Sequence, residues 1–481
     1  MLEELGRLTW GTALDWLYGE AMRRPMGPGT YPQQRARFFG PSNEPAPAPE
    51  RPSTSEEVLA EFRERVGPYL YNAQHPGSYS YFTPPPLPMS IAGEVLAQWV
   101  NQGVDVWHAG PVAAFVEEEV VRWLRDLVGF GEGSWGVLAS GGVMANIMGL
   151  TVARDVHLAK LRGLSSPPRG SALEGARVYA SDQAHFSIAR ALDTLGFPPE
   201  TLRILPSDER FRLHGEPVAE AIGEDRAAGR VPFAIAAVAG STNTGSVDLV
   251  GELAALAERE GLWLHVDAAY GGAARMSERD ADRVPDLERA DSVTVDPHKW
   301  FFQAYDIGGL VVKRRDDLRR TFLRSPEYYR TSRPEDEPLN WYEYSIEGTR
   351  RFRALKLWLS WKHLGTEGFA RLIEHNDDLA AYLARRCREL GDFEVLPREP
   401  ELSVVCFRHV PPGLPVDKLD AYQDRLQHAL EASGEGWVST TKLRGRTFLR
   451  AGVVNYLSTE EDADRVLDAL RRLSNEAAEG L

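Results

Sequence analysis

The chain has 481 residues, a length that predicts two or three domains rather than one core. Its 55 Lys and Arg against 70 Asp and Glu give a formal net charge of −15, which argues against a nucleic-acid partner or an anionic membrane surface. Only two cysteines occur, so neither a disulfide framework nor a cysteine metal site is expected, and a reducing cytoplasm is the expected location. We expect no signal peptide, and no apolar run is long enough to predict a membrane span.

The first 85 residues are predicted to form a helical arm. Leucines recur at helical spacing over residues 2–17, and a proline-rich connector follows over residues 41–52. Ser53, with Glu56 three residues later, has the pattern of a capping box that begins the next helix. Because a short helix on an extended arm cannot bury its apolar face alone, we expect the arm to lie on another surface, with a partner subunit as a good candidate.

Residues 86–365 alternate helical patterns with short runs rich in Val, Ile and Ala, which predicts an α/β domain with a parallel sheet covered on both faces. The runs expected to form strands are 177–181, 233–240, 262–269, 292–296 and 308–313. In such sheets, ligands bind beyond the carboxyl ends of the strands. The sequence pattern of residues 366–481 differs from that of the preceding region. It predicts a smaller α+β domain, with helices near 370–390 and 416–432.

Three predicted strands are each followed by a distinctive polar side chain, namely His185, Asp267 and Lys299. Each alone has an ordinary explanation, as a buried histidine, a helix-capping aspartate or a surface lysine. Together at one edge of a sheet they offer an amine nucleophile, a carboxylate and a flat imidazole. Pyridoxal phosphate chemistry requires this set, because a lysine holds the aldehyde, a carboxylate keeps the pyridine nitrogen protonated and a ring stacks on the cofactor.

The phosphate of such a cofactor needs donors, ideally the amides at a helix N-terminus. Residues 138–150 supply a candidate, because Ser140, Gly141 and Gly142 lead directly into a helix-compatible run. The spacing is not G-x-G-x-x-G, so a dinucleotide fingerprint is not met.

The segments "SDQAHFS", "LHVDAAYGG" and "DPHKW" resemble the group II pyridoxal phosphate-dependent amino acid decarboxylases, the family of aromatic-L-amino-acid decarboxylase. The similarity runs from about His75 through "GTRRFRALKLW" (348–358) to "FLRAG" (448–452). It implies a fold-type I structure, with a large domain built on a mostly parallel seven-stranded sheet, a small C-terminal α+β domain and an N-terminal helical arm. It also implies a homodimer with shared active sites.

The resemblance assigns roles by position. Lys299 would be the Schiff-base lysine, Asp267 the partner of the pyridine nitrogen and His185 the stacking ring, and His298 would lie beside the cofactor's linkage and phosphate. The remaining cofactor contacts implied are Thr242 near the ring hydroxyl, Gly141, Gly142 and Val143 at the phosphate, and Ala269, which is small enough to let the ring approach. Relatives often have a hydroxyl residue at position 143, so here a backbone amide would replace that contact.

Residues 322–344 form a long polar segment, a candidate for a mobile loop. The family carries on this loop a tyrosine that returns a proton after carbon dioxide leaves, and Tyr328 matches it, with Tyr329 as a close competitor. Relatives that make aldehydes have lost this tyrosine or the stacking histidine. Because the chain keeps both, plain decarboxylation is expected.

The segments 75–86 and 104–111 match the family's substrate side, the latter reaching in from the other subunit. Tyr81, Phe82 and Trp107 offer an aromatic surface, although aromatic residues are more often part of a core. Asp105 and His108 differ from the apolar residues of related aromatic enzymes, which leaves hydroxylated, indolic or basic substrates open.

We therefore expect decarboxylation of an L-amino acid, with tryptophan, tyrosine, phenylalanine or a hydroxylated analogue as the first candidates. The alternatives are an aldehyde synthase, a decarboxylase of aliphatic, acidic or basic amino acids, and another reaction of the same cofactor such as transamination, for which Arg450 could hold the carboxylate. A non-catalytic protein that kept the fold is a further alternative.

Overall fold

A computed structural model describes residues 2–324 and 338–479. The chain divides into two compact units. The large unit comprises Pro86–Asp377 with Pro400–Leu402, and the small unit comprises Met1–Pro85, Asp378–Glu399 and Ser403–Leu481. Within the described residues, no helix combines the length and the apolar character needed to cross a bilayer.

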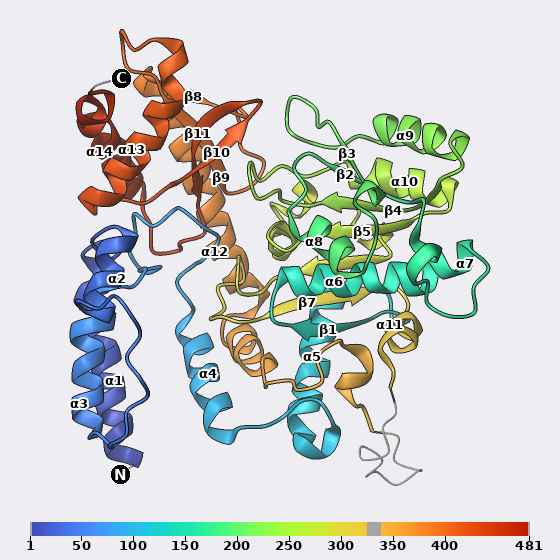
Figure 1. The fold of residues 1–481 in the computed structure, drawn as a ribbon, viewed down its shortest axis with the longest axis horizontal. Coiled ribbons are helices and arrows are strands. Elements are labelled where there is room, and N and C mark those ends of the chain that lie inside the picture. Colours follow the sequence, from blue (N-terminus) through green and yellow to red (C-terminus); the bar gives the residue numbers. More distant parts are fainter. Residues whose placement is uncertain (1, 325–337, 480–481) are drawn as a thin grey trace. The chain divides into compact units, whose positions relative to one another are not determined.

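The large unit is built on a seven-stranded sheet, which is mostly parallel as expected (Figure 1). Its spatial order is β1-β7-β6-β5-β4-β2-β3, and β7 runs antiparallel to both of its neighbours. The strands are β1 (Trp135–Ala139), β2 (Ala176–Ser181), β3 (Leu202–Leu205), β4 (Val231–Val238), β5 (Trp263–Asp267), β6 (Ser292–Val295) and β7 (Gly308–Val312). Since β2, β4, β5 and β6 are parallel, their carboxyl ends meet at one edge.

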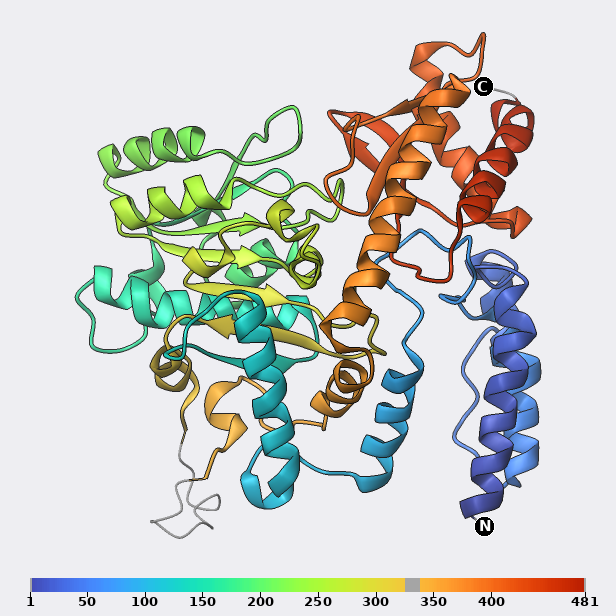
Figure 2. The same ribbon diagram turned by 180° about the vertical axis from the view of Figure 1, so that it is seen from behind.

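Helices cover both faces of this sheet, which explains why its central strands β5 and β6 are buried along their whole length. Figure 1 shows α6 (Gly142–Val152) and α8 (Ser187–Thr194) over one face, and Figure 2 turns the face with α9 (Gly215–Ala227) and α10 (Val250–Glu260) toward the viewer. The other helices of this region are α4 (Pro88–Val100), α5 (Pro111–Leu127), α7 (Ala159–Leu161), α11 (Arg315–Phe322) and α12 (Ala354–Leu390), which is interrupted at Gly365 by a φ of 65°.

All five runs predicted to be strands are strands, and the fold class is confirmed. Two further strands, β1 and β3, lie outside those runs. Both are at the edges of the sheet, where a strand has one neighbour only, and β3 has just four residues with a partly exposed pattern. Short edge strands carry a weaker periodic signal than central ones.

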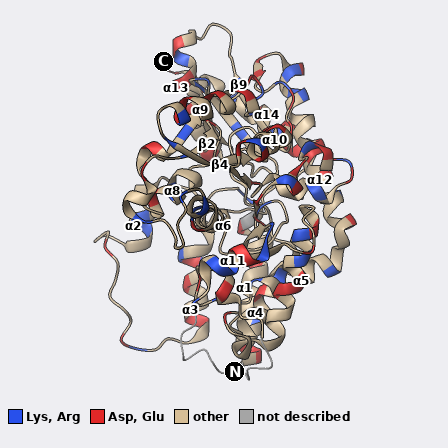
Figure 3. Ribbon diagram, turned by 90° about the vertical axis from the view of Figure 1, so that its right-hand side faces the viewer, with Lys and Arg blue, Asp and Glu red and all other residues tan. Residues whose placement is uncertain are grey.

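The small unit contains a four-stranded antiparallel sheet with the order β10-β11-β9-β8. The strands are β8 (Phe393–Val395), β9 (Val404–His409), β10 (Ser439–Leu443) and β11 (Arg446–Gly452), and the helices α13 (Leu419–Ser433) and α14 (Glu460–Ala478) belong to the same unit. Apolar side chains of β9, β11, α13 and α14 share one buried cluster. Acidic and basic residues are intermixed along helices such as α10 and α14 (Figure 3).

The N-terminal segment of the small unit contains α1 (Leu2–Tyr18), α2 (Tyr31–Phe39) and α3 (Ser55–Glu61). The predicted capping box is wrong by one residue, because the cap of α3 is Thr54 and its reciprocal partner is Glu57. The stretch "STSEE" offers both registers, and the backbone selects the one in which the threonine hydroxyl accepts from the third amide of the helix.

Candidate active site

The edge formed by the carboxyl ends of β2, β5 and β6 brings together the side chains of His185, Asp267 and Lys299. Asp267 is the last residue of β5, and Lys299 follows β6 by one turn. The charges of Asp267 and Lys299 both act on the pKa of His185, which follows β2. The turn before α6 lies at the same edge, because its Gly142 amide donates to Asp296, a neighbour of Lys299 in sequence.

Asp267 is 6% exposed and is held by two donors. Its Oδ2 accepts a hydrogen bond from Nδ2 of Asn146 at 2.7 Å, and its Oδ1 accepts one from the amide of Ala269 at 3.1 Å. A buried carboxylate with fixed donors keeps its position and direction. It can therefore present charge to a cationic ring nitrogen.

Asn146, in the second turn of α6, is a buried polar residue that sequence reasoning missed. Its amide group donates to Ser187 at 2.8 Å as well as to Asp267. Its Oδ1 accepts from Thr294 Oγ1 at 2.7 Å and lies 3.0 Å from Nε2 of His265, whose pKa burial lowers to about 4. The neutral His265 then donates from Nε2, so that every polar atom of Asn146 has a partner.

His185 is partly buried, and its Nδ1 lies 2.8 Å from Oγ of Ser187. Burial is the largest influence on its pKa and lowers it, Asp267 opposes this and Lys299 adds to it. The imidazole is thus favoured in its neutral form, which suits a ring that stacks on a flat cofactor and later handles a proton.

Lys299 lies on a turn that Pro297 helps to begin, and its Nζ is 3.7 Å from Oδ2 of Asp296. The next residue, Trp300, is fully buried, stacks on Tyr270 with centroids 4.9 Å apart and donates from Nε1 to Asn376 at 3.0 Å. The buried indole anchors the turn from behind, so the lysine is the member of this segment that stays accessible.

Asp296 is a second site residue that sequence reasoning missed. It is buried, and burial raises its pKa to about 7, against opposing effects of Lys299 and the Gly142 amide. Its Oδ2 accepts the Gly142 N–H at 2.9 Å, and its Oδ1 lies 3.1 Å from Nδ1 of His298. Its spacing, three residues before the lysine on a turn, was the available signal.

The predicted phosphate turn is tightly packed, which explains its glycines. A Cβ on Gly141 would lie 3.0 Å from Cε1 of His298, and a Cβ on Gly142 would lie 3.0 Å from Oδ2 of Asp296 and 3.2 Å from Cβ of Ala269. Val143 follows in the first turn of α6. Thr242 is exposed in the turn after β4.

These residues fit pyridoxal phosphate. The chain offers an accessible amine, a buried and doubly held carboxylate, a neutral imidazole and a helix N-terminus at one sheet edge. Oδ1 of Asp296 is buried and accepts no hydrogen bond within the described part of the chain. A bound group could change the protonation of this atom.

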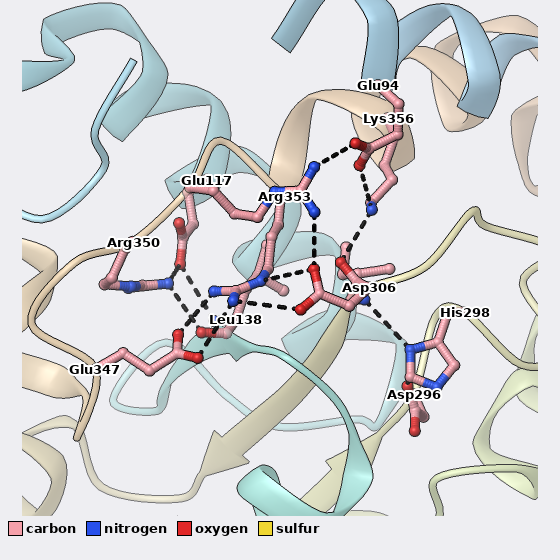
Figure 4. A network of polar contacts seen from close by, with 12 residues as sticks. Glu94, Glu117, Leu138, Asp296, His298, Asp306, Glu347, Arg350, Arg353 and Lys356 are labelled. Carbon is pink, nitrogen blue, oxygen red and sulfur yellow. Dashed lines mark hydrogen bonds and ion pairs between the residues drawn. The ribbon is translucent and has the colours of Figure 1, made fainter. Parts of the chain in front are cut away.

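A network of charged side chains holds the loop that follows the lysine turn (Figure 4). Asp306 accepts from Arg351 at 3.1 Å and from Arg353 at 3.3 Å, and its carbonyl accepts from Lys356 at 2.9 Å. The next amide, that of Ile307, donates to Nδ1 of His298 at 3.3 Å. The segment "GTRRFRALKLW" therefore reaches the site indirectly, by fixing the backbone beside His298.

The same network continues to Glu117 of α5 and to β1. Arg350 pairs with Glu117 and donates to the carbonyl of Leu138 at 2.8 Å, while Arg353 also pairs with Glu347 at 2.7 Å. Glu94 pairs with both Arg351 and Lys356.

The predicted substrate residues fall into both units. In the small unit, Tyr81 is 57% exposed with its ring 4.9 Å from that of Trp437, and Phe82 is buried beneath the guanidinium of Arg450 at 4.8 Å. Arg450 also donates to the carbonyl of Ser80 at 2.8 Å, so it holds this segment against β11.

In the large unit, the backbone carbonyl of Asp105 accepts from Tyr342 at 3.2 Å, and the amide of Trp107 donates to Asn340 at 3.0 Å. Oδ1 of Asp105 is buried and accepts no hydrogen bond from the described residues. Tyr328 and Tyr329, the candidate proton donors, lie outside the described residues.

The chain is similar to several known proteins. A family model described as the pyridoxal-dependent decarboxylase conserved domain matches residues 40–410. An aromatic-L-amino-acid decarboxylase of Bacillus atrophaeus is 34% identical over 432 residues, covering 89% of this chain and 88% of that protein. An L-2,4-diaminobutyrate decarboxylase of Acinetobacter baumannii is 30% identical over 404 residues, covering 82% and 79%. The crystal structure of "Oryza sativa TDC with PLP and tryptamine" superposes with a TM-score of 0.91 at 26% identity, covering 99% of this chain and 98% of that one.

Proposed function

This chain belongs to the pyridoxal-dependent decarboxylase family, and we propose that it converts an aromatic L-amino acid to its amine and carbon dioxide. The observation that carries the proposal is the meeting of Lys299, Asp267 and His185 at one sheet edge beside the N-terminus of α6. When bound, the cofactor supplies an electron sink for the electron pair left by departing carbon dioxide.

The residues proposed to hold the cofactor come from five segments. Lys299 would bind the aldehyde carbon, Asp267 the ring nitrogen, and His185 would cover the ring. The residues proposed near its other groups are Thr242 and Ala269 at the ring, and Gly141, Gly142, Val143 and His298 at the phosphate. Asn146 supports the assignment of Asp267, because its 2.7 Å hydrogen bond fixes the position of the carboxyl group proposed to face the ring nitrogen.

The proton steps are proposed to use groups of this chain. Asp267 would hold a proton at the ring nitrogen, and Tyr328 would return one to the carbon that has lost its carboxylate. Lys299 would hold the cofactor again once the product amine has left. The neutral state of His185, favoured by burial, suits a ring that covers the cofactor without adding positive charge to it.

An aromatic substrate is supported by the side chains on the proposed substrate segments, which include Tyr81, Phe82 and Trp107. It is also supported by the name of the Bacillus atrophaeus relative and by the tryptamine in the rice structure. One observation favours a second candidate, a basic amino acid. The buried Oδ1 of Asp105 could accept a hydrogen bond from a substrate ammonium group, and a relative named for diaminobutyrate is 30% identical.

We further propose a cytoplasmic homodimer with shared active sites, in which residues 1–85 form the dimerisation arm, residues 86–365 bind the cofactor and residues 366–481 form the small domain. Exposed apolar side chains support an interface. They occur on α1 and on α4 with the start of α5, and include Leu2, Trp10, Tyr18, Leu96, Trp99, Val112 and Phe115.

The decisive experiment is a carbon dioxide release screen over the proteinogenic and hydroxylated aromatic amino acids, with quantification of amine, aldehyde and ammonia. Carbon dioxide and amine in equal amounts support the proposal, and the preferred substrate separates the aromatic from the basic candidate. Aldehyde, ammonia and peroxide as products would instead identify an aldehyde synthase.

A second readout tests the cofactor assignment without turnover. Borohydride should fix pyridoxal phosphate to the peptide that contains Lys299, and the Lys299→Ala variant should remain unlabelled. Failure of the protein to bind added pyridoxal phosphate would indicate a non-catalytic role.

A further inference from the structure

Asp296 is a buried carboxyl group with no role in the reaction proposed above, although it touches three parts of the site. Only 1% of the residue is exposed. Its Oδ2 accepts from the Gly142 amide at 2.9 Å and lies 3.7 Å from Nζ of Lys299. Its Oδ1 is buried and accepts no hydrogen bond from the described residues, although Nδ1 of His298 is 3.1 Å away.

The protonation state of His298 indicates which protonation state is favourable for the neighbouring Oδ1 of Asp296. Burial lowers the pKa of His298 to about 3, so the ring is neutral, and its Nδ1 accepts the amide hydrogen of Ile307 at 3.3 Å. Nδ1 then carries no hydrogen that it could donate to Asp296. An ionised Oδ1 would face this electron-rich nitrogen at 3.1 Å in a buried site, which is repulsive, whereas protonation of the carboxyl removes that repulsion.

The other groups around Asp296 shift its protonation equilibrium in opposite directions. Lys299, on the same turn, and the Gly142 amide of α6 favour the ionised carboxylate, while burial and the charge of Asp267 on β5 favour the protonated form. Two further charges act on His298, the positive charge of Lys356 and the negative charge of Asp306. Burial is the largest of these effects and raises the pKa of Asp296 to about 7, so its proton is exchanged near neutral pH.

The Gly142 amide is the donor that Asp296 uses, and it is also the donor proposed for the cofactor's phosphate. An ionised carboxylate would compete with the phosphate for this N–H and would repel it. A protonated carboxyl has no charge to repel an anion.

We propose that Asp296 is a positioning residue that takes up a proton when pyridoxal phosphate binds, so that loading of the cofactor is coupled to one protonation at this carboxyl. The inference rests on the proposed function, because it assumes that the phosphate uses the N-terminus of α6. It goes beyond that function by making cofactor affinity fall as the pH rises above neutrality. It also assigns to Asp296 a role that neither Lys299 nor Asp267 can supply.

The test measures cofactor binding and not activity. Apoprotein is dialysed to equilibrium against pyridoxal phosphate between pH 6 and 8.5, for the wild type and for Asp296→Asn. Below neutrality the two affinities should be similar, because both side chains are uncharged. Above neutrality the dissociation constant of the wild type relative to the variant should rise about tenfold per pH unit, the slope for one linked proton.

Asp248→Asn is the matched control. Asp248 is also a buried carboxyl of the large unit with a pKa raised to about 7, but it accepts from the amides of Leu213 and Val238. This variant should keep the pH dependence of cofactor binding found in the wild type. Equal pH dependence in the wild type and Asp296→Asn would overturn the inference.

A second measurement counts the proton directly. Calorimetric titration of apoprotein at pH 8 in buffers of different protonation enthalpy should report uptake of about one more proton per bound cofactor by the wild type than by Asp296→Asn, because the proton balance of imine formation at Lys299 is common to both. No difference would mean that Asp296 keeps its charge as the counter-ion of Lys299. Absence of any binding, with no label on Lys299 after borohydride, would contradict the proposed function itself, so the two failures are distinguishable.

Discussion

Asn146 contacts four polar side chains at the sheet edge, although no motif marks it. It links α6 to Asp267 on β5, to Thr294 on β6 and to Ser187 at the start of α8. A hydrogen bond to a charged group contributes about 1.5–3 kcal/mol, and a buried acceptor left without its donor loses more than the bond itself. The position of Asp267 therefore depends on this amide.

We predict that Asn146→Ala weakens the binding of pyridoxal phosphate by about 10- to 100-fold, the equivalent of the lost charged hydrogen bond. Equilibrium dialysis of the apoprotein measures this. Gln423→Ala is the control, because Gln423 is a fully buried amide in the small unit that bonds to the backbone of His409. It should lower stability and leave cofactor affinity unchanged, and an equal loss in both variants would contradict the assigned role of Asn146.

Asp248 is a buried carboxyl group that makes the stability of the protein depend on pH. Its pKa is raised to about 7, so the native state holds a proton that the unfolded chain releases at lower pH. Its contribution to stability is present below the unfolded pKa and is lost as the pH rises through about 7. Asp248→Asn should therefore become more stable relative to the wild type by roughly 4 kcal/mol between pH 4 and 8. Urea unfolding across this range measures the difference, and a pH-independent difference would contradict it.

Tyr328 lies outside the described residues, and its prediction rests on the family resemblance. If this tyrosine returns the proton to carbon, Tyr328→Phe should shift the product from amine toward aldehyde while carbon dioxide is still released. Product analysis by mass spectrometry measures the ratio, with Tyr329→Phe as the neighbouring control. An unchanged amine yield for Tyr328→Phe, with a changed one for Tyr329→Phe, would transfer the role to Tyr329.

At the scale of elements, the buried pair of Glu117 and Arg350 joins α5, β1 and the segment before α12. Glu117 accepts from the amide of Leu138 at 3.2 Å, and Arg350 donates to the carbonyl of the same residue at 2.8 Å. Both side chains are inaccessible to solvent, and burial raises the pKa of Glu117 while Arg350 opposes that change. Removal of one partner leaves an uncompensated charge in the interior.

Arg350→Met should therefore lower the free energy of unfolding by about 3–5 kcal/mol at pH 8. The deficit should shrink at lower pH, because without Arg350 the pKa of Glu117 rises further and the carboxylate can take a proton. Arg371→Met is the control, since Arg371 forms an exposed pair with Glu367 and its loss should cost less than about 1 kcal/mol. Equal effects in the two variants would show that the buried pair contributes nothing beyond an exposed one.

Elements differ in how far local sequence predicts them. Residues 292–296, in which valines alternate with serine and threonine, and residues 308–313, which are apolar, were identifiable without knowledge of their neighbours. β1 and β3, at the edges, were not, because their assignment depends on pairing with β7 and β2. The cap of α3 at Thr54 was missed by one residue, because two overlapping pairs satisfy the same pattern.

At the scale of the whole molecule, exposed apolar side chains on α4 and at the start of α5 support the proposed dimer. Trp99 is 72% exposed and Phe115 is 53% exposed. Large aromatic side chains are enriched at protein interfaces, and burying them from water is favourable.

The double variant Trp99→Glu with Phe115→Glu should sediment as a monomer and lose activity, because two carboxylates would have to be desolvated in the interface. Sedimentation velocity measures the change in mass. Val416→Glu is the control, since Val416 is 80% exposed in the small unit and its replacement should leave the assembly intact. A double variant that remains a dimer would contradict an interface at this surface.

The sequence by itself determined the fold class and predicted the proposed cofactor residues, because Asp267 ends a strand, and His185 and Lys299 each follow one, whose pattern is local. Only the tertiary structure decided which other side chains lie beside these residues and bond to them. Asn146 bonds to Asp267 across 121 positions of sequence, and Asp296 meets the Gly142 amide across 154. Burial raises the pKa of Asp296 to about 7, and burial is a property of packing that local sequence does not encode.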